Sequence, residues 1–259
     1  MGLIKNTSFI HKVFWRYLFQ IALPFLILLM WHYVTKKELV PAAILPSLKD
    51  VYLSFQEQIS TKQLFLDLKV SLTRVIQGYT IAALLGIFFG VTMGISKKVE
   101  EFFKLTFTTI RQIPMIAWIP LIILWFGIDE ISKITIIVIA AFFPILLNTI
   151  NGIKKTDKKL IEVGYMYNLT HWEIFRKIYL PSAIPSIFVG LKLGLGISWM
   201  AVVGAEIIAA SSGIGYRITE ARSLMEPELV FVGIITIGLI GLIMDSGLTF
   251  ISKKLLKWE

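Results

Sequence analysis

The chain has 259 residues, 56% of them apolar, and a formal net charge of +9. Its mean hydropathy is +0.76, and its charged residues gather in short intervals between long apolar blocks. A soluble domain alternates apolar and polar residues over shorter distances, so this pattern excludes a soluble domain. It predicts an all-α, polytopic membrane protein. The chain contains no cysteine, which excludes disulfides and cysteine metal sites, and we predict no metal site.

Six apolar runs predict about six transmembrane helices, because a spanning helix needs about 20 residues. The runs are 17–35, 75–96, 112–128, 134–153, 182–206 and 229–244. The third run is short and is expected to take in residues from 102–111, and five or seven spans are alternative counts. We divide the chain in two. Residues 1–69 would hold a cytoplasmic N-terminal segment, the first span and an external connection, and 70–259 a core of about five spans.

Basic residues gather in alternate connections, which indicates the orientation of the chain, because short cytoplasmic loops are rich in lysine and arginine. They lie at the N-terminus, after the second and fourth spans, and in the C-terminal tail. Both termini are therefore expected in the cytoplasm, in a multi-pass protein of the cell membrane. The same loops account for most of the positive charge, so no nucleic-acid partner is predicted.

Glycines at four-residue spacing predict helix packing in two spans, because glycine lets two backbones approach closely in lipid. They are Gly86, Gly90 and Gly94 in the second span and Gly190 and Gly194 in the fifth. Three prolines within spans, Pro114, Pro120 and Pro144, are expected to bend their helices.

The basic connection at 154–181 has the pattern of two short helices joined at a corner. Asp157 can cap the first helix, and Asn168 tolerates the left-handed backbone of a corner. Thr170 and Glu173 can form a capping box for the second helix. The apolar positions are Leu160, Val163, Gly164 and Tyr167, then Trp172, Phe175, Ile178 and Tyr179. An apolar surface in the cytosol is costly unless covered. The loop therefore predicts either a protein-docking site or an amphipathic pair lying on lipid.

The residues of this loop resemble the coupling motif of the integral membrane permeases of ATP-binding-cassette importers. The matching positions are Glu162, Val163, Gly164, Asn168, Phe175, Ile178, Leu180 and Pro181, and the capping pair Thr170 and Glu173 completes the predicted ATPase-coupling set. Two positions depart from the motif: Val163-Gly164 replaces an alanine pair, and Asn168 replaces a corner glycine. Asparagine keeps the left-handed corner accessible.

Further matches extend the resemblance over nearly the whole chain, and it looks closest to the sulfonate, nitrate and taurine branch of that family. They are 44–47 (ILPS), 71–79 (SLTRVIQGY), 111–114 (RQIP), 125–128 (WFGI), Ala205-Glu206 with 213–216 (GIGY), and 238–241 (GLIG) with Asp245.

The resemblance implies a type I importer permease fold, with a permease core at 70–259 and the coupling loop at 154–181. It also implies a homodimer of this chain, two ATPase subunits that hold ATP and Mg, and an external substrate-binding protein. The chain itself is expected to bind no cofactor and to hydrolyse no ATP. It contains no Gly-Lys dipeptide, so a GxxxxGK[ST] phosphate loop cannot form.

Polar and aromatic residues within the predicted spans are candidates for the solute pathway or its gate. They are Gln112, Trp118, Lys192, Ser198, Trp199 and Glu206. Each has an alternative role: Lys192 can extend to the interface, Glu206 can support a helix junction, and the tryptophans can anchor the membrane surface.

The resemblance favours a small anion such as an alkanesulfonate, taurine or nitrate as the solute. A thiamine-precursor pyrimidine or riboflavin is the alternative. A membrane-embedded enzyme is a distant hypothesis, because the three histidines stand far apart and form no metal motif. A non-transporting scaffold would use the same loop, and loss of uptake on deleting this chain alone would count against it.

Overall fold

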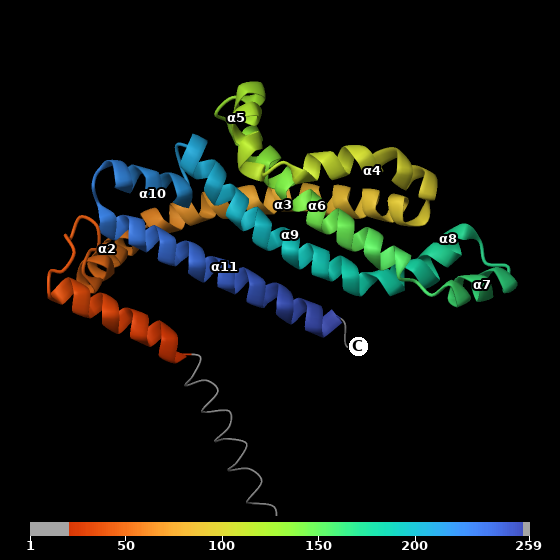
Figure 1. Ribbon diagram of the computed structural model, residues 1–259, viewed down its shortest axis with the longest axis horizontal. Coiled ribbons are helices and arrows are strands. Elements are labelled where there is room, and N and C mark those ends of the chain that lie inside the picture. Colours follow the sequence, from red (N-terminus) through yellow and green to blue (C-terminus); the bar gives the residue numbers. More distant parts are fainter. Residues whose placement is uncertain (1–20, 256–259) are drawn as a thin grey trace, which may run out of the picture.

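The computed structural model describes residues 21–255, and the regular structure within that range is helical (Figure 1). The elements are the helix Ile21–Lys36, α2 (Leu48–Ser60), α3 (Gln63–Ile95), α4 (Lys97–Gln112), α5 (Met115–Phe126), α6 (Glu130–Lys154), α7 (Lys158–Met166), α8 (His171–Ile174), η1 (Phe175–Tyr179), α9 (Leu180–Ala209), α10 (Ile214–Ser223) and α11 (Pro227–Leu255). The long helices run roughly alongside one another (Figure 1). Helices α7 and α8 lie at one end of the molecule, and α2 and α10 lie at the other.

The predicted all-α membrane fold is confirmed. Within residues 21–255, four helices are long and apolar enough to cross a bilayer: Gln63–Ile95, Glu130–Lys154, His171–Ala209 and Pro227–Lys254. Helices α4 and α5 together would make a fifth span, bent by 99°. Of the predicted first span, residues 17–20 lie outside the described range, and the rest falls in Ile21–Lys36.

The predicted third span, 112–128, is broken just after Gln112, where Pro114 is expected to bend the helix. Ile113 is extended, with φ −79° and ψ 120°, and a new helix begins at Met115. Pro114 explains the break: its ring disfavours a helical conformation at the preceding residue, and its nitrogen carries no hydrogen. The segment 102–111 therefore belongs to a separate helix, α4, which ends at this break.

Helix α6 lies between α3 and α9 and forms close contacts with a row of glycines on each side. On α3, a Cβ added at Gly86 would lie 2.9 Å from Ile145 Cγ2, and one added at Gly90 would lie 2.5 Å from Thr149 Cβ. Gly94 meets Ile153 in the same way. On α9, a Cβ at Gly190 would lie 2.8 Å from Asn148 Cβ, and Gly194 faces Ile145. At these glycines, the backbones of α3 and α9 are in direct contact with side chains of α6, and the contacts leave no space for a larger residue.

Candidate functional site

The loop between α6 and α9 adopts the predicted helix–corner–helix. The Asp157 carboxylate accepts a hydrogen bond of 2.9 Å from the Lys159 backbone N–H at the start of α7. Asn168 forms the corner with a positive φ of 54°. Thr170 and Glu173 form the capping box in both directions. These local predictions are confirmed.

Gly164 is where the two short helices of the loop cross. A Cβ at this position would lie 2.9 Å from Ile178 Cδ1 and 3.3 Å from Ile174 Cγ1. Ile174 is buried at the crossing. The replacement of an alanine by Gly164 therefore permits a close approach between α7 and the helix that follows it.

The outer surface of the loop is apolar and open. We define the loop surface as the exposed side chains Leu160, Val163, Met166, Tyr167 and Trp172. Met166 is 81% exposed and Tyr167 77% exposed. The expectation that Phe175, Ile178 and Tyr179 share this exposed surface is wrong, because they are half-buried. Phe175 packs against Trp172, with ring centroids 5.4 Å apart, and Ile178 packs over Gly164.

The second helix of the loop continues into the membrane without interruption, as the 39-residue run His171–Ala209. A span needs about 20 residues, so this run is longer than a bilayer requires. The Glu173 carboxylate accepts hydrogen bonds from the Thr170 backbone N–H at 3.0 Å and from Lys177 Nζ at 3.1 Å. The π-helical turn η1 ends at Tyr179, two residues before Pro181, which cannot donate a backbone hydrogen bond.

Four of the six candidate pathway residues, Glu206 among them, have partners inside the chain. Lys192 Nζ lies 3.1 Å from Asp245 Oδ1 and donates to Thr249 Oγ1 at 2.8 Å. Ser198 is buried and donates to the carbonyl oxygen of Gly194, a residue of its own helix. Trp199 is buried and donates through Nε1 to the Ile237 carbonyl, which joins α9 to α11.

Glu206 belongs to a charged cluster, buried around Arg74 and exposed at Glu130, that we had not predicted as a unit. Arg74, on α3, is 2% exposed, and its Nη1 donates to Glu206 Oε1 at 2.7 Å. The same guanidinium binds Glu130, at the start of α6, through Nε at 2.7 Å and Nη2 at 2.5 Å. Ser71 also donates to Glu206, and the Gly215 backbone N–H donates to it at 2.9 Å. The cluster joins α3, α6, α9 and α10.

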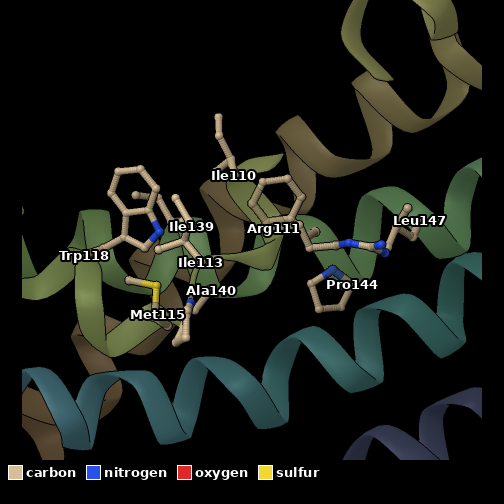
Figure 2. Close-up of a pocket in the computed structure, with 11 residues that line it drawn as sticks. Ile110, Arg111, Ile113, Met115, Trp118, Ile139, Ala140, Pro144 and Leu147 are labelled. Atoms are coloured by element: carbon tan, nitrogen blue, oxygen red, sulfur yellow. The ribbon is translucent and has the colours of Figure 1, made fainter. Parts of the chain in front are cut away.

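Gln112 and Trp118 lie at the break between α4 and α5. A cavity of about 290 Å³ opens there against α6 (Figure 2). Its walls are mostly apolar, and Arg111 is its charged residue. Trp118 also lines the cavity, and its buried Nε1 has no hydrogen-bond partner within the described part of the chain. Gln112 is exposed at the last residue of α4 but does not line the cavity.

Comparison with known proteins places these features in a family. Residues 82–257 match the model of the binding-protein-dependent transport system inner membrane component. The aliphatic sulfonates transport permease protein SsuC of Bacillus subtilis (strain 168) is 39% identical, over 92% of this chain and 86% of the relative. The taurine transport system permease protein TauC of Escherichia coli (strain K12) is 31% identical, over 90% and 86%. The nitrate import permease protein NrtB of Leptolyngbya laminosa is 33% identical, over 76% and 70%.

Solved structures show the same fold at low sequence identity. A chain of an amino acid ABC transporter superposes with a TM-score of 0.64 at 18% identity, covering 77% of this chain and 98% of that one. A chain of the MetNI methionine ABC transporter, in an inward-facing conformation, superposes with a TM-score of 0.56 at 18% identity, covering 69% and 91%. With its sequence matched over most of its length and its fold matched as well, the chain belongs to the family of inner membrane components of binding-protein-dependent transport systems.

Proposed function

We propose that this importer permease carries a small anion and that its loop 154–181 docks on a cytoplasmic ATPase. The solute proposal is supported by the relatives, whose names specify aliphatic sulfonates, taurine and nitrate. These solutes share a compact oxyanion group. None of the relatives described above is named for a pyrimidine or riboflavin, so the anion is the better-supported candidate.

The loop surface is the observation that carries the docking proposal. It combines exposed apolar side chains with a basic surround, and it lies at the end of the molecule (Figure 1). Large exposed apolar patches mark interaction sites. The corner that presents them is fixed by the two helix caps, at Asp157 and at Thr170, and by the crossing at Gly164, so the surface is already ordered before a partner binds.

The assembly we propose is a homodimer of this chain, two ATPase subunits and an external substrate-binding protein. ATP and Mg would be held by the ATPases, and both termini and the loop would face the cytoplasm. Closure of the ATPases on nucleotide would then move the loops and rock the spans between inward-open and outward-open arrangements.

Reconstitution tests the solute. The permease, its ATPase and its binding protein are placed in proteoliposomes, and uptake of methanesulfonate, taurine, nitrate, riboflavin and a hydroxymethylpyrimidine is measured with and without ATP. We expect ATP-dependent uptake of at least one of the three oxyanion solutes. Uptake of riboflavin or the pyrimidine in their place would contradict the proposal.

Docking is tested in the same preparation with Trp172→Ala. Buried tryptophans at interfaces typically contribute about 2 kcal/mol or more, so we expect at least a tenfold loss of co-purified ATPase. Leu224→Ala is the matched control, because Leu224 is 63% exposed and directly follows α10, which lies at the opposite end of the molecule. Equal ATPase recovery with both variants would show that the loop surface binds something else, such as lipid.

A further inference from the structure

Arg111 lies near the end of α4, where contact of its charged side chain with lipid would be unfavourable. It is the residue before the last of α4, which starts at Lys97, so it lies about 20 Å along the helix from that end. Its side chain is exposed, and no carboxylate in the described residues forms an ion pair with it. Charged residues at membrane depth almost always face the bundle interior or a water-filled cavity. Contact with lipid would therefore be an unusual environment for Arg111.

Arg111 connects two cavities. The cavity at the α4–α5 break shares Arg111, Phe143 and Leu147 with a second cavity of about 200 Å³, between α4 and α6. In Figure 2, the Arg111 side chain runs past Pro144 toward Leu147, while Trp118 stands at the other end of the first cavity. We call the two cavities together the α4–α6 groove.

The groove carries positive charge from its middle to its loop end. Lys104 and Lys154 line the second cavity with Arg111, and Glu100 is the acidic residue there. Glu100 is engaged by Lys154, with an oxygen–nitrogen distance of 2.6 Å. Lys104 stands seven residues before Arg111, two helical turns away on the same face. Among residues 21–255, neither Arg111 nor Lys104 forms an ion pair, so both contribute positive charge along the groove.

Lys192 offers a contrast, because its charge is already neutralised. Asp245 lies 3.1 Å from its ammonium group, so a solute anion near Lys192 would also meet a carboxylate. Arg111 forms no ion pair with a carboxylate in the described residues, so an anion bound to it would not be repelled by such a partner. The charges therefore favour the α4–α6 groove over the α9–α11 contact as the place for an anion.

We propose that the α4–α6 groove is the path of the solute anion through this chain, and that Arg111 binds the anion's oxyanion group at the junction of the two cavities. The buried Nε1 of Trp118 supplies a second, unused donor at the far end of the groove. This inference rests on the proposed function, because it names the residue that would contact the proposed class of solute.

This chain contains no cysteine, so a cysteine introduced into it is its single thiol, and labelling in the assembled transporter is read from the mass of this chain. Thr108→Cys places a thiol of similar size in the second cavity, one turn from Arg111. We expect the anionic reagent 2-sulfonatoethyl methanethiosulfonate to modify it faster than the cationic 2-(trimethylammonium)ethyl reagent, by about tenfold after correction for their intrinsic rates. Adding Arg111→Gln should lower this ratio several-fold, and adding Lys97→Gln, outside both cavities, should not.

Leu84→Cys is the control for lipid exposure, because Leu84 is 67% exposed on α3 and lines neither cavity of the groove. It should react with neither reagent. No reaction at Thr108→Cys, or a ratio that Arg111→Gln leaves unchanged, would overturn the proposal. Because labelling requires no transport, this result is independent of which solute is carried.

Uptake gives the second readout. Arg111→Gln should lower the maximal rate of ATP-dependent uptake of the transported anion at least tenfold, and Arg111→Lys should retain part of it. Both Arg111 variants should be recovered in the assembled complex, and Lys97→Gln, outside both cavities, should keep the uptake rate of the unmodified transporter. Full uptake by Arg111→Gln would overturn the assignment of Arg111 while leaving the importer function intact, whereas loss of the assembled complex in both variants would show a structural role.

Discussion

Arg74 and Glu206 illustrate how much a single buried contact can contribute. Both side chains are almost fully removed from solvent, and each satisfies the other's charge. Removing one member of such a pair typically costs about 3–5 kcal/mol, because the remaining charge is left buried without a partner.

We expect Arg74→Leu to lower the thermal unfolding temperature of the detergent-solubilised permease strongly, or to prevent its accumulation in the membrane. Lys97→Leu is the matched control, since Lys97 forms an exposed pair with Glu101 at 3.8 Å, and such pairs contribute less than about 1 kcal/mol. Fluorescence-detected thermal unfolding of both variants checks this. Equal melting temperatures would contradict the importance of the buried pair.

Residues whose partners are close in the chain could be predicted from the sequence, and those with distant partners could not. The caps at Asp157 and Thr170 and the corner at Asn168 each act within a few residues of themselves. The partners of Arg74 stand 56 and 132 residues away. The sequence contains Arg74 within a recognisable motif, but nothing in it specifies which carboxylate that residue meets.

At the scale of helices, α6 is held on two faces by glycine contacts. A methyl group at Gly90 would lie 2.5 Å from Thr149 Cβ, a distance that side chains do not adopt, so α3 and α6 would have to separate. Overpacking of this kind typically costs about 1–3 kcal/mol.

We therefore expect Gly90→Ala to lower the unfolding temperature and the yield of assembled complex. Gly247→Ala, at a helical glycine with nothing within 4 Å, should leave stability unchanged or raise it, because alanine favours helix by about 1 kcal/mol. Thermal unfolding and size-exclusion chromatography distinguish the two. Unchanged stability in Gly90→Ala would show that the α3–α6 contact is looser than described.

Hydropathy could not predict the angle between α4 and α5. The run 112–128 is apolar enough to predict a span, and Pro114 predicts a bend. The 99° angle depends on how α5 packs through Ile119 and Ile122, which only the three-dimensional contacts determine. The cavity beside Arg111 follows from that angle, so its location could not be predicted either.

For the molecule as a whole, rigidity is unevenly distributed. Helix α6 buries eleven residues between its neighbours. Helix α5 buries two, and it points away from the other long helices (Figure 1). Amide exchange rates follow this kind of contact density.

We predict that hydrogen exchange followed by mass spectrometry will show the slowest amides in α6 and faster exchange in α5 of the isolated permease. Exchange in α5 should slow on assembly of the full transporter, when a second copy of this chain can cover it. Protection of α5 equal to that of α6 in the isolated chain, unchanged by assembly, would contradict this distribution.

The unbroken helix from His171 to Ala209 has a mechanical consequence. Its first turn carries Trp172 of the loop surface, and Glu206, in contact with Arg74, lies near its other end, about 50 Å away. The two sites therefore lie at opposite ends of one helical run. A tilt of about 6° would displace one end by about 5 Å relative to the other, so movement of the loop surface would be transmitted along this helix to the contact between Glu206 and Arg74.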